Sequence, residues 1–223
     1  MRIITVIIVC TFLTSYGVQK KTVNSNATAA IEAKNEVTKI KQCFANYKSS
    51  ILNNKGEEAV EYVDSRTIKY YQNILDKTKM ADSTEINSMN IMDKFMVFSI
   101  RHRTAKEDIL KFDGKQLLVY AIQEGMVGKN SVANNEIGDV EVDENFGKGQ
   151  LIANGTPAPM YFHFYKEEGN WKIDLTSIFP VATQAFQKMA EESGEEENEY
   201  LFMLLEMITG NKPTNEIWKT IID

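Results

Sequence analysis

Seven polar residues interrupt otherwise apolar patterns in this chain, and their side chains could carry out acid–base chemistry. They are Asp64, Tyr71, Arg101, His102, Arg103, His163 and Asp174. A buried carboxylate beside a histidine or an arginine has a shifted pKa, which is typical of groups that move protons during a reaction. We therefore treat these seven residues as one candidate pocket.

The same residues also have two purely structural interpretations. In the first, Asp64 or Asp174 forms an ion pair with Arg101 or Arg103 and fixes a helix to the sheet. In the second, His163 and its neighbours lie on the solvated face of the sheet. For Asp174 we expect pairing with one of the two arginines, which leaves the carboxylate ionised and idle. No catalytic residue is therefore assigned.

Composition and motifs exclude several classes of protein. The net charge of −6 argues against a nucleic-acid partner, because phosphate binding needs clustered lysine and arginine. The two histidines are isolated, and no pair of metal-ligating residues has the usual spacing, so no metal site is expected. The chain lacks a nucleophile elbow, a phosphate-binding glycine loop and a dinucleotide fingerprint, so no cofactor is expected. The body of the chain also lacks an apolar run long enough for a transmembrane helix.

The clearest structural pattern is at residues 158–177, which are predicted to form a β-hairpin. Apolar and polar side chains alternate on both sides of a glycine-containing turn at 166–170, as is typical of paired strands. The side chains expected to face the helices are Phe162, Phe164, Trp171, Ile173 and Leu175. Tyr161 would then lie on the opposite face, because a shift of one residue exchanges the two faces of a strand.

The rest of the chain predicts helices before the sheet and after it. Apolar residues recur three and four apart over 28–52, 57–77 and 82–103, with shorter helices up to residue 126. The predicted fold is α+β, with N-terminal helices packed on a curved antiparallel sheet of about four strands and a C-terminal helical extension. The predicted boundaries are an N-terminal helix at 18–56, an α+β domain at 57–180 and the helical extension at 181–223.

Residues 1–17 have the layout of a secretory signal peptide. A short basic start precedes a nearly all-apolar run at 3–13, and small residues surround a cleavage site after Gly17. The alternative is a buried N-terminal strand. We expect export to the periplasm or the extracellular space, with a mature chain that begins near Val18. Cys10 follows Val9 instead of a small residue, which argues against a lipid anchor at Cys10.

The segment Glu168-Gly169-Asn170-Trp171-Lys172-Ile173-Asp174-Leu175 resembles the closing strand of the nuclear transport factor 2-like superfamily, which includes ketosteroid isomerase and polyketide-cyclase-like proteins. The helix at 59–64, followed by Tyr70-Tyr71, resembles the opening helix of that superfamily. The resemblance covers about 57–180 and points to an exported bacterial member. It implies a cone-like sheet whose mouth the helices partly close. Enzymes of the superfamily use Asp, His and Tyr inside the cone, but none of their catalytic motifs is matched in order here.

Three functional hypotheses follow. The preferred one is an exported non-catalytic module that binds a small apolar ligand or a protein partner, with a homodimer as one arrangement. The second is a lyase- or isomerase-type enzyme that uses an Asp–His pair in the cone. The third is an envelope-assembly structural protein that docks through a helix at 200–208. A cavity lined by Asp64, Tyr71, His163 and Asp174 would favour the first two, and a solid core with an exposed apolar patch near Phe202 would favour the third.

Overall fold

The computed structural model describes residues 19–127 and 129–222, so the predicted signal peptide at 1–17 lies outside the described residues. The chain divides into two units, Met1–Asn35 and Glu36–Asp223. Helix α1 (Gln19–Leu52) begins in the first unit and ends in the second. All contacts described below lie within the second unit.

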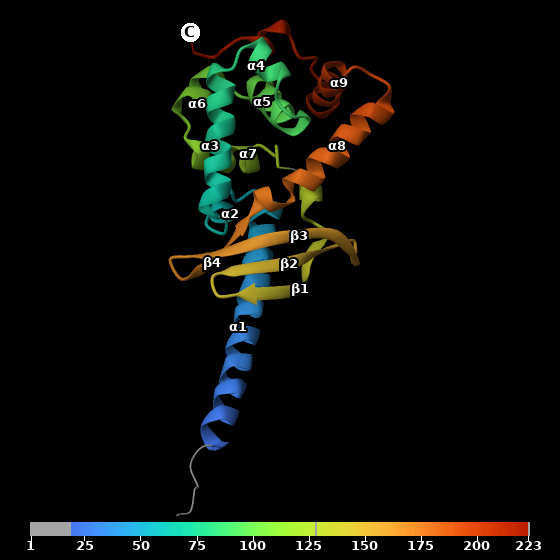
Figure 1. Ribbon diagram of the computed structural model, residues 1–223. Coiled ribbons are helices and arrows are strands. Elements are labelled where there is room, and N and C mark those ends of the chain that lie inside the picture. Colours follow the sequence, from blue (N-terminus) through green and yellow to red (C-terminus); the bar gives the residue numbers. More distant parts are fainter. Residues whose placement is uncertain (1–18, 128, 223) are drawn as a thin grey trace, which may run out of the picture. The chain divides into compact units, whose positions relative to one another are not determined.

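The sheet contains four antiparallel strands in sequence order, side by side in Figure 1. The strands are β1 (Asn135–Asp143), β2 (Phe146–Ala153), β3 (Thr156–Glu167) and β4 (Asn170–Asp174). The turns Asn154-Gly155 and Glu168-Gly169 have positive φ at both residues, which is the backbone that a tight two-residue hairpin requires. The α+β class and the hairpin are therefore confirmed, but the second strand ends at Asp174 and residues Leu175–Ile178 form a 3-10 helix instead of continuing it.

The inner face of the sheet packs against the second half of α1. Phe162 is 6% exposed and Phe164 is fully buried, whereas Tyr161 is 40% exposed, so the predicted inward face is confirmed. The Phe44 ring of α1 lies 5.5 Å from the Phe162 ring. A Cβ atom added at Gly147 would lie 2.5 Å from the Ile40 side chain, so this glycine allows α1 to approach β2 closely.

The helix predicted over 57–77 is interrupted and forms α2 (Gly56–Val60) and α3 (Ser65–Met80). Between them, Val63 forms a bridge with Ile173 of β4, and this pairing breaks the helical hydrogen bonds. The Asp64 side chain then accepts a hydrogen bond from the Thr67 backbone amide at 2.9 Å and caps α3. The polar residue that interrupts the apolar stripe therefore marks the start of a new helix.

The helix predicted over 82–103 also divides, into α4 (Ser83–Asn87) and α5 (Ile91–Arg103), because Asn90 caps α5. Next come α6 (Lys106–Lys111) and α7 (Gly114–Gln123). Helix α6 begins after Ala105, which offers no side-chain cap. A Cβ atom at Gly114 would lie 2.6 Å from the Gln72 backbone nitrogen, so α7 packs very closely on α3.

The C-terminal helices share a hydrophobic core with α4 and α5. After η1 (Lys129–Ser131) and the sheet, the remaining elements are η2 (Leu175–Ile178), α8 (Phe179–Ser193), α9 (Glu197–Thr209) and η3 (Asn215–Trp218). Figure 1 shows α8 leading from the sheet to α9. The Phe98 ring of α5 lies 4.8 Å from Trp218, and Lys94 pairs with Glu197 at 2.6 Å. These contacts hold α9 and η3 against α5.

Candidate functional site

An apolar cavity of about 400 Å³ lies among helices α3, α5 and α7, with one wall residue from α9. The residues that line it are Tyr71, Ile74, Met92, Phe95, Met96, Ser99, Ile100, Arg103, Leu117, Ala121, Gly125, Met126, Val127 and Ile208. This volume falls within the range of small-molecule pockets in proteins. The cavity is therefore large enough for a small ligand.

Helix α5 provides the longest wall of the cavity. Its lining residues run from Met92 to Arg103 at spacings of three and four, which places them on one face of the helix. Phe98, on another side of α5, packs instead against the C-terminal helices. Met92, Met96 and Met126 contribute flexible and polarizable side chains, which adapt to ligands of different shape. The wall is apolar and deformable.

Three residues with polar side chains also line the cavity, namely Tyr71, Ser99 and Arg103. Burial raises the pKa of Tyr71 to about 12, so its hydroxyl stays protonated at neutral pH. Arg103 Nη2 donates to the backbone oxygen of Glu124, at the end of α7, at 3.1 Å. A mostly apolar wall with a few polar groups is the usual composition of a site that orients a small molecule.

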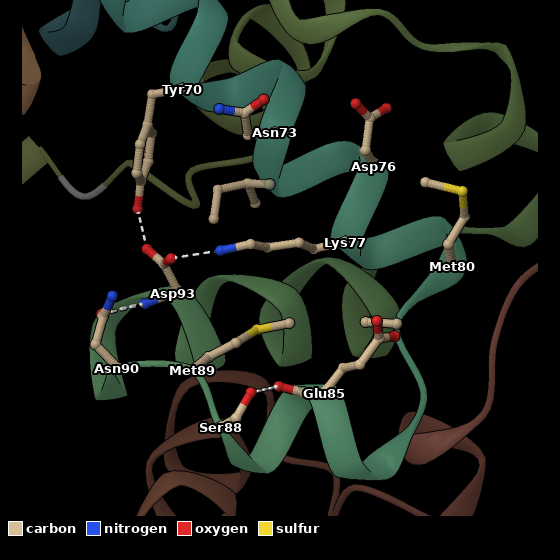
Figure 2. Close-up of a pocket in the computed structure, with 12 residues that line it drawn as sticks. Tyr70, Asn73, Asp76, Lys77, Met80, Glu85, Ser88, Met89, Asn90 and Asp93 are labelled. Carbon is tan, nitrogen blue, oxygen red and sulfur yellow. Dashed lines mark hydrogen bonds and ion pairs between the residues drawn. The ribbon is translucent and has the colours of Figure 1, made fainter.

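A second, more polar cavity of about 800 Å³ lies between α3 and the α4–α5 region (Figure 2). Tyr70 and Lys77 both point toward Asp93 there (Figure 2). The Tyr70 hydroxyl donates to Asp93 Oδ1 at 2.5 Å, and Lys77 Nζ donates to Oδ2 at 2.8 Å. Burial and the Asp93 carboxylate together raise the pKa of Tyr70. Both oxygens of the Asp93 carboxylate accept hydrogen bonds from side chains of α3. We therefore interpret this cluster as a structural link between α3 and α5.

The seven candidate residues lie in three different places. Tyr71 and Arg103 line the apolar cavity. Arg101 and His102 line a separate cavity of about 440 Å³ beside the C-terminal segment, where His102 Nε2 is 3.1 Å from Thr209 Oγ1. The remaining three residues lie at the β3–β4 end of the sheet, and they are Asp64, His163 and Asp174. The Asp64 backbone amide donates to the Ile173 carbonyl, and His163 lies opposite Asp174 on the adjacent strand.

The expected pairing of Asp174 with Arg101 or Arg103 is wrong. Asp174 Oδ1 accepts hydrogen bonds from the Thr176 amide at 2.9 Å and the Thr176 hydroxyl at 2.6 Å, which cap η2. Arg101 instead donates to the backbone oxygens of Thr78, Ala81 and Ile217 at 2.9, 2.7 and 3.0 Å. Carbonyl groups at the end of a helix have no intrahelical partner, so they compete well for a buried guanidinium. Burial lowers the pKa of Arg101 to about 10.

The predicted Asp–His pair consists of neighbours on adjacent strands. His163 and Asp174 occupy directly opposite positions on β3 and β4. The His163 ring packs against Phe146 at 5.2 Å, and in the described part of the chain no hydrogen bond joins this ring to Asp174. Asp64, which is completely buried, accepts from Thr67 and pairs with Arg66 at 3.1 Å. These carboxylates stabilise local structure.

The described residues allow two further findings about metals and membranes. Over residues 19–127 and 129–222, no group of three or more His, Cys, Asp or Glu side chains could hold a metal ion. Within the same ranges, no helix combines the length and the apolar character that crossing a bilayer demands.

Sequence reasoning missed most of the cavity wall. Met92, Met96 and Leu117 follow ordinary amphipathic spacing, and the same spacing is expected of side chains packed in a solid core. Asp93 was also missed, although it interrupts the apolar face of its helix and follows the cap Asn90 by three residues. That interruption is the signal that could have identified the polar cluster.

A scan against protein-family models and searches of curated proteins and of solved structures found no significant match to this chain. The geometry of the cavities and the chemistry of their side chains are therefore the basis for the function proposed below.

Proposed function

We propose that this protein is a non-catalytic module that binds a small apolar ligand in the cavity among α3, α5 and α7. The observation that carries the proposal is the cavity of about 400 Å³, whose wall is mainly aliphatic, aromatic and methionine side chains. Transfer of apolar surface from water into such a cavity is favourable by roughly 25 cal/mol per Å². The signal-peptide layout of residues 1–17, with its apolar run at 3–13, leads us to propose that the module is exported.

The hydrogen bonding of the acidic groups supports a binding role over the lyase or isomerase alternative. Asp174 caps η2, Asp64 caps α3, and Asp93 is engaged by Tyr70 and Lys77. A general base needs a carboxylate that is available to a substrate proton. Each of the three carboxylates accepts hydrogen bonds from its own neighbours, which favours the module.

We also propose membership of the nuclear transport factor 2-like superfamily. Helices packed on a four-stranded antiparallel sheet support this relationship. The resemblance implies a pocket inside a cone of strands, whereas the apolar cavity found here lies among helices. Membership therefore rests on the sequence segments at 59–71 and 168–175.

Docking of a protein partner on α9 is a second candidate function. Met203, Met207 and Ile208 on this helix are 45%, 70% and 56% exposed, and exposed apolar groups on one helix favour association. If a second copy docks here, Met207→Lys should abolish dimerisation in sedimentation equilibrium. A parent chain that is monomeric at high concentration would exclude the homodimer.

The ligand proposal is tested with a neutral apolar probe. We expect 1-decanol to shift NMR signals of residues on α5 and α7 in the parent protein in a saturable way. Ser99→Leu places a larger side chain in the cavity and should weaken binding by at least about tenfold, which corresponds to about 1.4 kcal/mol.

Ser49→Leu is the matched control, because Ser49 is an exposed serine on α1. It should bind 1-decanol like the parent. The proposal is rejected if the parent does not bind 1-decanol, or if Ser99→Leu binds it as well as the parent while retaining its fold by circular dichroism.

A further inference from the structure

Arg103 is the cationic residue among those that line the mainly apolar cavity. Its Nη2 donates to the Glu124 backbone oxygen, and within the described part of the chain Arg103 forms no ion pair. A guanidinium has five N–H donors, so a single bond to a carbonyl leaves most of them available. By contrast, Arg66 pairs with the Asp64 carboxylate at 3.1 Å. The charge of Arg103 is therefore available to a ligand.

The position of Arg103 along α5 gives the cavity a polar end. The α5 residues that line the cavity extend from Met92 to Arg103, which corresponds to roughly 16 Å at 1.5 Å per residue. Arg103 is the last of them, and Ser99 precedes it by one turn on the same face. The remaining α5 wall is Met92, Phe95, Met96 and Ile100. A cation and a hydroxyl thus occupy one end of an apolar wall.

We propose that the ligand is a single-chain amphiphile whose carboxylate head binds Arg103 and whose hydrocarbon chain lies along α5. This inference rests on the proposed function and specifies the class of its ligand. A planar guanidinium matches a carboxylate in bidentate geometry, and Ser99 adds a donor one turn away. A single cation selects a head with a single negative charge. At about 30 Å³ per water-sized group, the cavity holds roughly a dozen heavy atoms, which corresponds to a chain of about ten carbons.

The test compares decanoate with 1-decanol, which have the same chain length and differ in the charge of the head. Binding to the parent is measured by NMR titration near pH 8, where a carboxylic acid is ionised. We expect decanoate to bind at least about tenfold more tightly than 1-decanol, because hydrogen bonds between a carboxylate and a guanidinium are charge-assisted and strong. The Arg103 Nε–Hε signal of the parent should shift with decanoate and not with 1-decanol.

Two variants assign the preference to Arg103. Arg103→Met should bind both probes with the affinity of the parent for 1-decanol. Lys106→Met is the matched control, since it removes the same charge from an exposed position three residues away, and it should keep the preference for decanoate. If Arg103→Met does not fold, the side-chain signal of Arg103 in the parent still decides the question.

Equal affinity of the parent for decanoate and 1-decanol would overturn the inference and leave the proposed apolar site intact. A preference for decanoate that survives in Arg103→Met would also overturn it. Failure of both probes to bind would reject the proposed function itself, so the two failures are distinguishable.

Discussion

The indole Nε1 of Trp171 donates a hydrogen bond of 2.6 Å to the carboxylate of Glu36, although 135 residues separate the two in the sequence. Lys166 donates to the same oxygen, Oε2, at 2.9 Å, and Lys39 donates to Oε1 at 2.8 Å. The hydrogen bond from Lys39, followed by those from Lys166 and Trp171, lowers the pKa of Glu36 from 4.5 to about 2. This carboxylate therefore links α1 to the β3–β4 hairpin.

The Glu36 pairing predicts a specific pH dependence of stability. A carboxyl group whose pKa is lower in the folded state stabilises the fold above its unfolded pKa, and this contribution is lost as the pH falls through the folded pKa. Glu36→Gln should therefore lower the free energy of unfolding at pH 6, and the difference from the parent should shrink between pH 4.5 and about 2. Urea unfolding at several pH values measures this difference.

Glu58→Gln is the control for this experiment, because Glu58 forms an exposed ion pair with Lys55 and should contribute little at any pH. A difference between Glu36→Gln and the parent that does not change below pH 4.5 would contradict the link between Glu36 ionisation and stability.

The two faces of β3 should respond differently to truncation. Phe162 is 6% exposed and packs on Phe44, so Phe162→Ala should cost about 3–5 kcal/mol of unfolding free energy. Tyr161 is 40% exposed and stacks with Lys148 at 4.3 Å, so Tyr161→Ala should cost about 1 kcal/mol or less. Equal losses in urea unfolding would show that the assignment of the two faces is incorrect.

Asp174 and Arg101 should act independently, because they share no hydrogen-bond partner among the described residues. Asp174→Asn keeps an oxygen that can accept from Thr176, so we expect only a small loss of stability. Arg101→Leu leaves buried carbonyls without donors and should cost about 1–3 kcal/mol. The double variant should show the sum of the two effects in thermal or urea unfolding. A clear loss of stability in Asp174→Asn that disappears in the Arg101→Leu background would instead indicate that the two residues interact.

The Tyr70–Asp93–Lys77 cluster should behave as a coupled unit. Tyr70→Phe removes the donor to Asp93 and should cost about 1–2 kcal/mol, because hydrogen bonds to charged groups are strong. In a double-mutant cycle with Asp93→Asn, the combined loss should be smaller than the sum of the single losses. Additive losses would indicate that the hydrogen bond between the two side chains contributes no stability.

Local sequence patterns predicted the elements whose structure depends on residues close together in the sequence. Alternation around Glu168-Gly169 predicts the hairpin and its inward face, since the pleat places alternate side chains on opposite sides of a strand. The helix predicted over 57–77 is interrupted around Val63, because Ile173 of β4 donates to the Tyr62 carbonyl and accepts from the Asp64 amide. This interruption depends on a strand more than a hundred residues away, which no local window contains.

The sequence by itself determined the α+β class, the hairpin register and the amphipathic faces of the helices, because these follow from side-chain periodicity within each element. Only the tertiary structure determined which of those helix faces pack against each other incompletely and so enclose a cavity. Arg103 reaches the cavity because α3, α5 and α7 pack around it, and Arg101, two residues earlier, points to different carbonyl groups because α5 rotates by about 100° per residue. Asp174 pairs with neither Arg101 nor Arg103, because both guanidinium groups donate to helix-end carbonyls that have no partner within their own helix.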